Sequence, residues 1–219
     1  MSPGLTQAEV ASITNTGPGA GTVDPRIDRT RLVVRQATLD ELGEVGYGSF
    51  TIESVAARAG VGKSTIYRHW RDKLALIADA FETSHEVMVP DSETGTARER
   101  TERLVRHVAE VVVDSAFSRC IPALIEGAAR DPRLREFHHR YSAERRQSLI
   151  DVIEEGAAGG EFPADVDAEL AALALLGVVF YGRLMAAEPF EPARARELVN
   201  AVLPPAPRRE GDGREQPAL

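Results

Sequence analysis

The stretch from Thr51 to Lys73 constrains this chain more than any other, and it reads TIESVAARAGVGKSTIYRHWRDK. Apolar residues recur at helical spacing in its first half, and Thr51 stands where its side chain can cap that helix. Gly60 lies in the turn that follows, because glycine readily takes the left-handed conformation that ends a helix. We expect a second short helix from about Gly62 to Trp70. Two short helices joined by a glycine-containing turn predict a helix-turn-helix.

The second expected helix has a polar outward face. At about 100° per residue, Ile66 and Trp70 share one side and should face the core. The other side and its flanks carry Ser64, Thr65, Tyr67, Arg68 and His69. Lys63 starts nearer the core side, but a long side chain in the first turn can still reach outward. Hydroxyls and cations without an acid suit phosphate oxygens and base edges, so this face predicts DNA binding rather than a merely solvated helix.

The same segment also fits a loose phosphate-binding loop. Residues 57–64 read ARAGVGKS, with Ala57 where that pattern has its first glycine. A phosphate loop follows a buried strand, whereas the residues before this one have a helical period. An all-α enzyme that binds a nucleotide through Lys63 and Ser64 is therefore the weaker alternative.

The order, spacing and residue types of this region resemble the DNA-binding segment of the TetR family of bacterial repressors. The resemblance rests on Thr51–Val61, Ser64–Trp70 and Asp72–Leu74. It implies an N-terminal three-helix DNA-binding unit and a C-terminal helical ligand-binding and dimerisation domain. It also implies a homodimer that binds a palindromic double-stranded operator. The matching positions that commonly hold phosphates are Thr51, Tyr67, His69 and Lys73.

Four further residues are expected to read base edges: Lys63, Ser64, Thr65 and Arg68. Arg68 is the best guanine reader, because a guanidinium can donate two hydrogen bonds to the guanine edge. Glu53 occupies a place where some relatives of this type carry a basic residue that reads a base. An acid there can accept only from a base donor such as a cytosine amine, which leaves its role open.

The charge is unevenly distributed. The net charge is −8, but residues 24–75 carry nine Lys and Arg against seven Asp and Glu. The rest of the chain is therefore strongly acidic, which should orient the basic end toward DNA. Arg26, Arg29 and Arg31 follow the N-terminal segment and either touch phosphate or a minor groove, or are simply solvated.

Cysteine content and hydropathy favour a soluble cytoplasmic protein. Cys120 is the only cysteine, so no disulfide can form within the chain. No N-terminal signal pattern is present. The longest apolar run, Leu170 to Tyr181, is too short to span a bilayer.

The whole chain reads as all-α, with about nine helices. We expect a disordered arm over 1–24, the helix-turn-helix DNA-binding domain over 25–73, the ligand-binding and dimerisation domain over 74–203, and a disordered tail over 204–219. The first helix should span 29–46, and the fourth should start at Asp72 as its cap and end at Pro90. Asp131 and Pro132 should begin the seventh helix, which runs to about residue 155.

The helix expected over 167–187 is apolar on nearly every side. It is either an internal core helix or, as we favour, pairs with its copy in a second subunit, aided by the helix over 192–203.

Arg145 interrupts the apolar stripe of the seventh helix. Its guanidinium could form an internal ion pair, or it could line a cavity with Tyr141 and Ser148 for a small effector that bears a carboxylate or another acceptor. His85 and His107 lie on or beside the inward stripes of their helices, as core histidines or as effector contacts. The sequence shows no metal-ligand spacing, no catalytic group and no cofactor motif.

These features together predict a ligand-responsive repressor whose effector shifts a population toward a state that cannot bind DNA. A regulator of the same fold that lacks a ligand, or that activates transcription, is the alternative.

Overall fold

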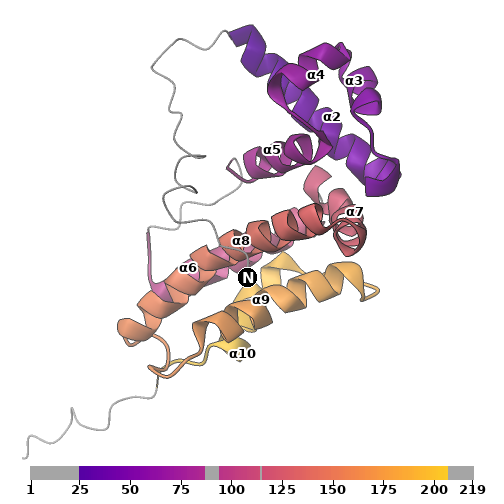
Figure 1. Cartoon of the computed structure of the whole chain (residues 1–219). Helices are drawn as coiled ribbons and strands as arrows, with labels where there is room; N and C mark the ends of the chain where they lie inside the picture. Colours follow the sequence, from indigo (N-terminus) through magenta and orange to yellow (C-terminus); the bar gives the residue numbers. More distant parts are fainter. Residues whose placement is uncertain (1–24, 87–93, 114, 207–219) are drawn as a thin grey trace, which may run out of the picture. The chain divides into compact units, whose positions relative to one another are not determined.

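A computed structural model describes residues 25–86, 94–113 and 115–206. Within these ranges the regular structure is helical, with nine α-helices and no strand (Figure 1). They are α2 (Pro25–Ser49), α3 (Ile52–Ala59), α4 (Lys63–His69), α5 (Lys73–Glu86), α6 (Ala97–Val113), α7 (Ala116–Arg130), α8 (Pro132–Ala158), α9 (Ala168–Leu184) and α10 (Ala195–Val202), with a 3-10 turn at Pro192–Arg194. The all-α prediction is confirmed. The contacts divide the chain after Val33, and the part from Val34 onward contains the rest of α2 and all the later helices.

The first helix begins earlier than expected, and its backbone breaks from the helical conformation at Gly46, as predicted. It runs from Pro25 to Ser49, although Gly46 inside it has φ 74° and ψ 167°. The backbone N–H of Phe50 still donates to the Gly46 carbonyl at 3.1 Å. The glycine expected to end the helix therefore kinks it, because only the backbone at Gly46 leaves the helical region.

The helix-turn-helix forms as predicted. The Thr51 hydroxyl accepts from the Ser54 N–H at 3.1 Å and caps α3. Gly60 takes the left-handed conformation, with φ 65°, and ends that helix. On α4, Ile66 is fully buried, and the indole N–H of Trp70 donates to Asp79 of α5 at 2.7 Å. These contacts fix α4 against α5.

One buried cluster joins the helix-turn-helix to α7 and α8. It includes Leu42, Ile66, Phe81 and Leu134. Cys120 of α7 lies in it and donates from Sγ to the Leu39 carbonyl at 3.0 Å. Burial raises the pKa of this thiol to about 12. The helix-turn-helix is therefore packed continuously onto the helices behind it, and the domain boundary expected at residue 73 stays a prediction.

A second core lies among α6, α8, α9 and α10 (Figure 1). Phe162 is fully buried and lies close against Gly156, where an added Cβ would come within 2.4 Å of its ring. The Glu161 carboxylate accepts from the Ala97 and Arg98 N–H groups at 2.9 and 3.1 Å, which caps α6. These contacts tie the loop after α8 to the start of α6.

The remaining helix limits differ modestly from the predictions. The Asp72 carboxylate caps α5 through the Ala75 N–H at 2.8 Å, and Asp131 with Pro132 begins α8, both as expected. The helix expected over 167–187 is shorter, because α9 ends at Leu184. The expected arm over 1–24, the expected stop at Pro90 and the tail from residue 207 lie outside the described residues. None of the described helices has the length and apolar character needed to cross a membrane.

Candidate functional sites

The outward face of α4 carries the side chains that the sequence indicated. Lys63, Ser64, Tyr67, Arg68 and His69 are exposed, and Thr65 is half-buried. Tyr67 keeps 52% of its surface accessible, which is unusual for a ring beside a buried core. The face therefore presents hydroxyls, cations and one phenol to the surroundings. Such groups donate to phosphates and base edges.

Thr51 and Lys73 lie at the starts of the flanking helices. Thr51 is exposed at the N-cap of α3, where its hydroxyl also donates to Ser54 Oγ at 3.0 Å. Lys73 is the first residue of α5, and its Nζ lies 3.9 Å from the centre of the Tyr47 ring. The same Nζ donates to the Tyr47 carbonyl at 3.5 Å. Lys73 is therefore held beside Tyr47, at a helix N-terminus that itself attracts anions.

One acid reaches the α4 surface, which corrects the expectation of an acid-free face. Glu53 Oε1 of α3 lies 2.9 Å from Lys63 Nζ of α4, and both side chains are about half exposed. The hydrogen bond from Lys63 lowers the pKa of Glu53. The periodicity of α4 alone cannot show this acid, because it comes from the neighbouring helix. Lys63 is therefore paired, not a free cation.

An aromatic cluster lies behind the helix-turn-helix and involves α5, α7 and α8. Phe81 is fully buried, with its ring centre 5.2 Å from Phe117 and 5.8 Å from Tyr141. Phe137 lies 5.7 Å from Tyr141. The interactions around Phe81 are edge-to-face, the arrangement that aromatic quadrupoles favour.

Arg145 lies at the edge of this cluster. Its guanidinium is 4.4 Å from the centre of the Tyr141 ring, and its Nε is buried without a hydrogen-bond acceptor. Burial raises the pKa of Tyr141, and the Arg145 charge opposes that rise. No ion pair of Arg145 is found in the described part of the chain, where its guanidinium instead lies over the Tyr141 ring, so the internal pair expected for it does not form there.

The other residues expected in the effector site are dispersed. Ser148 is exposed on α8, so it does not line an interior cavity with Tyr141 and Arg145. Ser148 stands three positions after Arg145 and is therefore its neighbour on the helix surface. The Arg145 guanidinium nevertheless lies over the Tyr141 ring and not toward Ser148. His107 is half-buried on α6, and burial lowers its pKa while Glu110 opposes that shift. His85 lies on α5, and its side chain is outside the described residues.

The nucleotide-binding alternative fails on local structure. Residues 52–59, which precede Lys63 and Ser64, form helix α3 and not the strand that a phosphate loop follows.

Over the described ranges, no three His, Cys, Asp or Glu side chains gather as metal ligands.

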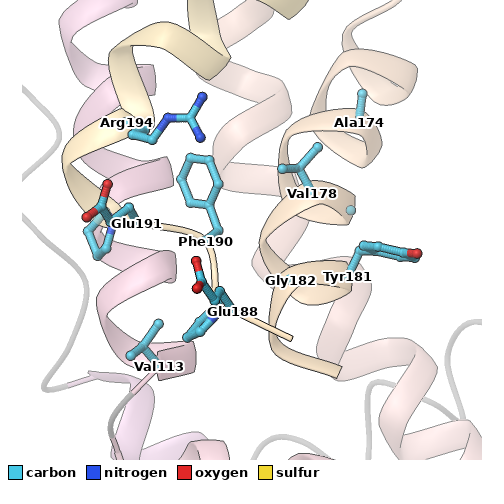
Figure 2. A pocket seen from close by; sticks show the side chains of 12 residues that line it. Val113, Ala174, Val178, Tyr181, Gly182, Glu188, Phe190, Glu191 and Arg194 are labelled. Atoms are coloured by element: carbon cyan, nitrogen blue, oxygen red, sulfur yellow. The ribbon is translucent and has the colours of Figure 1, made fainter. Parts of the chain in front are cut away.

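The outward face of α9 is apolar. Exposed large side chains along it are Leu170, Leu173, Val178 and Tyr181, followed by Met185 just after the helix ends. Beside it lies a groove of about 1000 Å³ between α9 and the segment before α10. Figure 2 shows Phe190 and Tyr181 among the side chains that line this groove. Phe190 packs so closely on Gly182 that an added Cβ there would lie 2.8 Å from the Phe190 nitrogen. Contiguous exposed apolar surface of this kind marks an interaction site.

A set of polar contacts around Tyr47 was not anticipated. The Tyr47 hydroxyl donates to Asp131 at 2.6 Å, and Arg133 of α8 donates to Asp72 at 2.9 Å. Only the capping role of the two aspartates was visible in the sequence. Their partners lie 84 and 61 residues away, beyond the reach of any local pattern.

Comparisons with known families agree with this geometry. Residues 34–80 match the profile of the bacterial regulatory proteins of the tetR family. Residues 89–202, more than half of the chain, match the tetracyclin repressor-like C-terminal domain.

The chain belongs to the TetR family.

Individual relatives of this TetR-family regulator include the uncharacterized HTH-type transcriptional regulator YdeS of Bacillus subtilis, 29% identical over 80% of this chain and 88% of YdeS. The uncharacterized regulator Mb1581 of Mycobacterium bovis is 30% identical, over 77% of this chain and 83% of its own. A crystal structure of FadR from Bacillus subtilis in complex with stearoyl-CoA shares the fold, with a TM-score of 0.67, 20% identity, and coverage of 79% and 97%. The protein is a helix-turn-helix transcriptional regulator, and both relatives carry the description of an HTH-type transcriptional regulator.

Proposed function

We propose that this TetR-family regulator is a repressor that binds a palindromic operator as a homodimer and leaves it when a small molecule binds. The observation that carries the proposal is the α4 face, whose exposed Ser64, Tyr67 and Arg68 stand on a helix anchored by buried Ile66. A helix of this kind enters the major groove, and its outward side chains reach the base edges.

The proposed DNA contacts divide into two groups. Thr51, Tyr67, His69 and Lys73 hold phosphates, and this positions the helix without reading sequence. Ser64, Thr65 and Arg68 read base edges, with Arg68 on a guanine. Lys63 reads a base as one half of its pair with Glu53, in which an acceptor and a donor lie side by side.

The proposed dimer forms through α9, aided by α10. The outward α9 side chains include Leu170 and Tyr181, which are 63% and 64% exposed. A second copy of the same face would cover them, because an isologous two-fold contact pairs a surface with itself. Such symmetry places two recognition helices for two half-sites, about one turn of DNA apart.

The proposed effector site lies at the aromatic cluster around Phe81 and Tyr141. Arg145 supplies a buried Nε that lacks an acceptor, and a buried donor of this kind is costly unless a partner arrives. A carboxylate or another acceptor on a small apolar molecule would satisfy it. FadR, which shares the fold, was crystallised with stearoyl-CoA, an acyl ligand. His85 of α5 and His107 of α6 are kept as further proposed contacts of the effector.

Release would follow from unequal affinity. Phe81 stands on α5, which begins beside the DNA-binding helices, so an effector at the cluster would bias the position of α5. Only a molecule that binds the DNA-incompetent state more tightly can shift the population away from the operator.

A mobility-shift titration tests the proposal. The full-length protein is titrated onto DNA that flanks its own gene, over a salt series, and the titration is repeated with a panel of small aromatic and aliphatic acids. We expect sequence-specific, salt-dependent binding that one class of acid reverses. Binding that no acid reverses would favour the regulator without a ligand, and an increase in transcription from that DNA would favour an activator. Absence of specific binding would refute the proposal.

A further inference from the structure

Two aspartates that cap helices in this protein also accept a hydrogen bond from a side chain of another helix. Asp131 begins α8, and its Oδ1 accepts from the Arg133 and Leu134 N–H groups at 2.9 and 3.4 Å. Its Oδ2 accepts from the Tyr47 hydroxyl at 2.6 Å. One oxygen therefore caps α8, while the other ties α8 to the end of α2.

Asp72 repeats this arrangement at the start of α5. Its Oδ1 accepts from the Ala75 N–H at 2.8 Å, and its Oδ2 accepts from Arg133 Nη2 at 2.9 Å. Arg133 stands in the first turn of α8. The start of α8 is thus tied both to the end of α2 and to the start of α5, through two different residues.

Packing at the α7–α8 corner, residues 127–133, holds the Tyr47 ring in place. A Cβ added at Gly127 would lie 2.6 Å from Tyr47 Cγ and 2.6 Å from Leu134 Cδ2, so only glycine leaves room for both. Tyr47 is buried, and Lys73 covers its ring. The hydroxyl therefore has little freedom to leave Asp131 while the corner stays packed.

We propose that Tyr47 and Arg133 are positioning residues, which set the orientation of α5, and thereby of α4, relative to α8. This inference rests on the proposed operator binding. The contact from Trp70 to Asp79 carries the position of α5 to the end of α4. Tyr141 stands on α8 ten residues after Asp131, about 15 Å along the helix axis. A displacement of α8 at the aromatic cluster therefore reaches α4 through the two ties.

Two ties constrain more than apolar packing does. Apolar side chains can slide past one another at little cost, whereas hydrogen bonds lose strength steeply with distance and angle. Both acceptors are ionised carboxylates, which make the stronger class of hydrogen bond. Because the ties join α8 to two different helices, they resist rotation of the corner as well as translation.

The test measures tolerance of operator spacing, which requires no effector. The double variant Tyr47→Phe/Arg133→Ala removes both ties and leaves both caps intact. The full-length variant and the parent are titrated onto the natural operator and onto versions whose half-sites are moved apart by one or two base pairs. We expect the preference for natural spacing, as a ratio of dissociation constants, to fall about tenfold in the variant, a change typical of coupling between sites.

A matched control is Arg135→Ala. Arg135 also lies near the start of α8, but it donates to the Ala128 and Ala129 carbonyls of α7 and not to α5. The spacing ratio of this variant should equal that of the parent. A purely structural role for the ties would instead weaken binding equally at every spacing, and that result would overturn the inference.

The two proposals fail in different ways. If the parent protein binds no DNA specifically, operator binding and this inference both fall. If the parent binds with a clear preference for natural spacing and the double variant keeps the same ratio, only this inference falls. Thermal unfolding of the double variant, followed by circular dichroism, verifies that the titrations use folded protein.

Discussion

Helices α4 and α9 each leave one face uncovered, and the two faces have opposite chemistry. On α4 the inward Ile66 is apolar and the outward residues are hydroxyls and cations. On α9 both sides are apolar, with Leu175 fully buried and Leu170 and Tyr181 exposed. The chemistry of each exposed face indicates its partner. The hydroxyls and cations of α4 suit a partner with anionic acceptors, whereas the apolar side chains of α9 suit a partner with an apolar surface.

The largest effect should follow a charge on α9. Tyr181→Asp would place a carboxylate in the proposed two-fold interface, where an unpaired charge costs several kcal/mol. We expect a monomer by sedimentation and a loss of operator affinity of at least about a hundredfold, because one half-site binds far more weakly than two. Tyr181→Phe keeps the ring and should remain a dimer. A dimeric Tyr181→Asp protein would show that α9 is not the interface.

On α4, the largest effect should come from Arg68→Ala. Loss of a bidentate guanine contact costs about 1–3 kcal/mol and removes the preference at one base pair only. Titration onto operators mutated one position at a time would reveal that position. Arg68→Lys keeps the charge but loses the two-pronged contact, so it should recover general affinity without recovering that preference. Uniform weakening across all operators would make Arg68 a phosphate contact.

Tyr67→Phe should have a smaller and less selective effect. Removal of one hydroxyl that donates to a phosphate costs about 1 kcal/mol, or several-fold in affinity. The loss should be the same for every operator variant, in contrast to Arg68→Ala. A loss confined to one base pair in the same titrations would show that Tyr67 reads a base.

Glu53→Gln should act in the opposite direction. Removal of the acid frees Lys63 from its 2.9 Å pair, so binding to non-specific DNA should strengthen by about two- to threefold. On non-specific DNA, where Lys63 has no base to read, the freed ammonium can contact a phosphate instead, so the slope of log affinity against log salt should steepen by about one. Glu44→Gln is the control, because Glu44 pairs with Arg58. An unchanged slope would mean that Lys63 does not reach the DNA.

The smallest effect should come from a fall in pH, which protonates the carboxylates that cap α5 and α8 behind α4. The bond from Arg133 lowers the pKa of Asp72, and the bond from Tyr47 lowers the pKa of Asp131. A lowered pKa stabilises the fold above the ordinary pKa of about 3.9, and this contribution disappears as pH falls through the folded pKa. We expect a loss of under about 1 kcal/mol per group, as for exposed pairs.

Urea unfolding at pH 7 and pH 3 would measure this loss. The pH-dependent part should shrink in Asp131→Asn, because the amide cannot titrate. An equal loss in that variant would assign the acid sensitivity to other carboxylates.

The helix-turn-helix was predictable because its determinants are local. Thr51 caps through a residue three positions away, and Gly60 ends α3 through its own backbone. The pair between Glu53 and Lys63 was missed because it depends on the angle between two helices. Helical period likewise placed Tyr141 and Arg145 on one face, but it could not show that the guanidinium would stack on the ring and leave Ser148 outside.

The buried face of α9 could not be predicted from the sequence, for a different reason. A helix that is apolar on every side has no period from which to choose the buried face. The structure makes that choice through α6, α8 and α10, which cover Leu175 and Val179 and leave Leu173 and Val178 outside. The aromatic cluster could not be predicted from the sequence either, because Phe81, Phe117 and Tyr141 come together only when three helices pack.

The buried thiol of Cys120 can serve as an intrinsic probe of local opening in this protein. It is the only cysteine in the chain, and its raised pKa leaves almost no thiolate at neutral pH. A thiol reagent can therefore react only when α7 separates from α2 near Leu39. The labelling rate counts these openings in the unaltered protein, so it would report how often the DNA-binding helices loosen from the helices behind them.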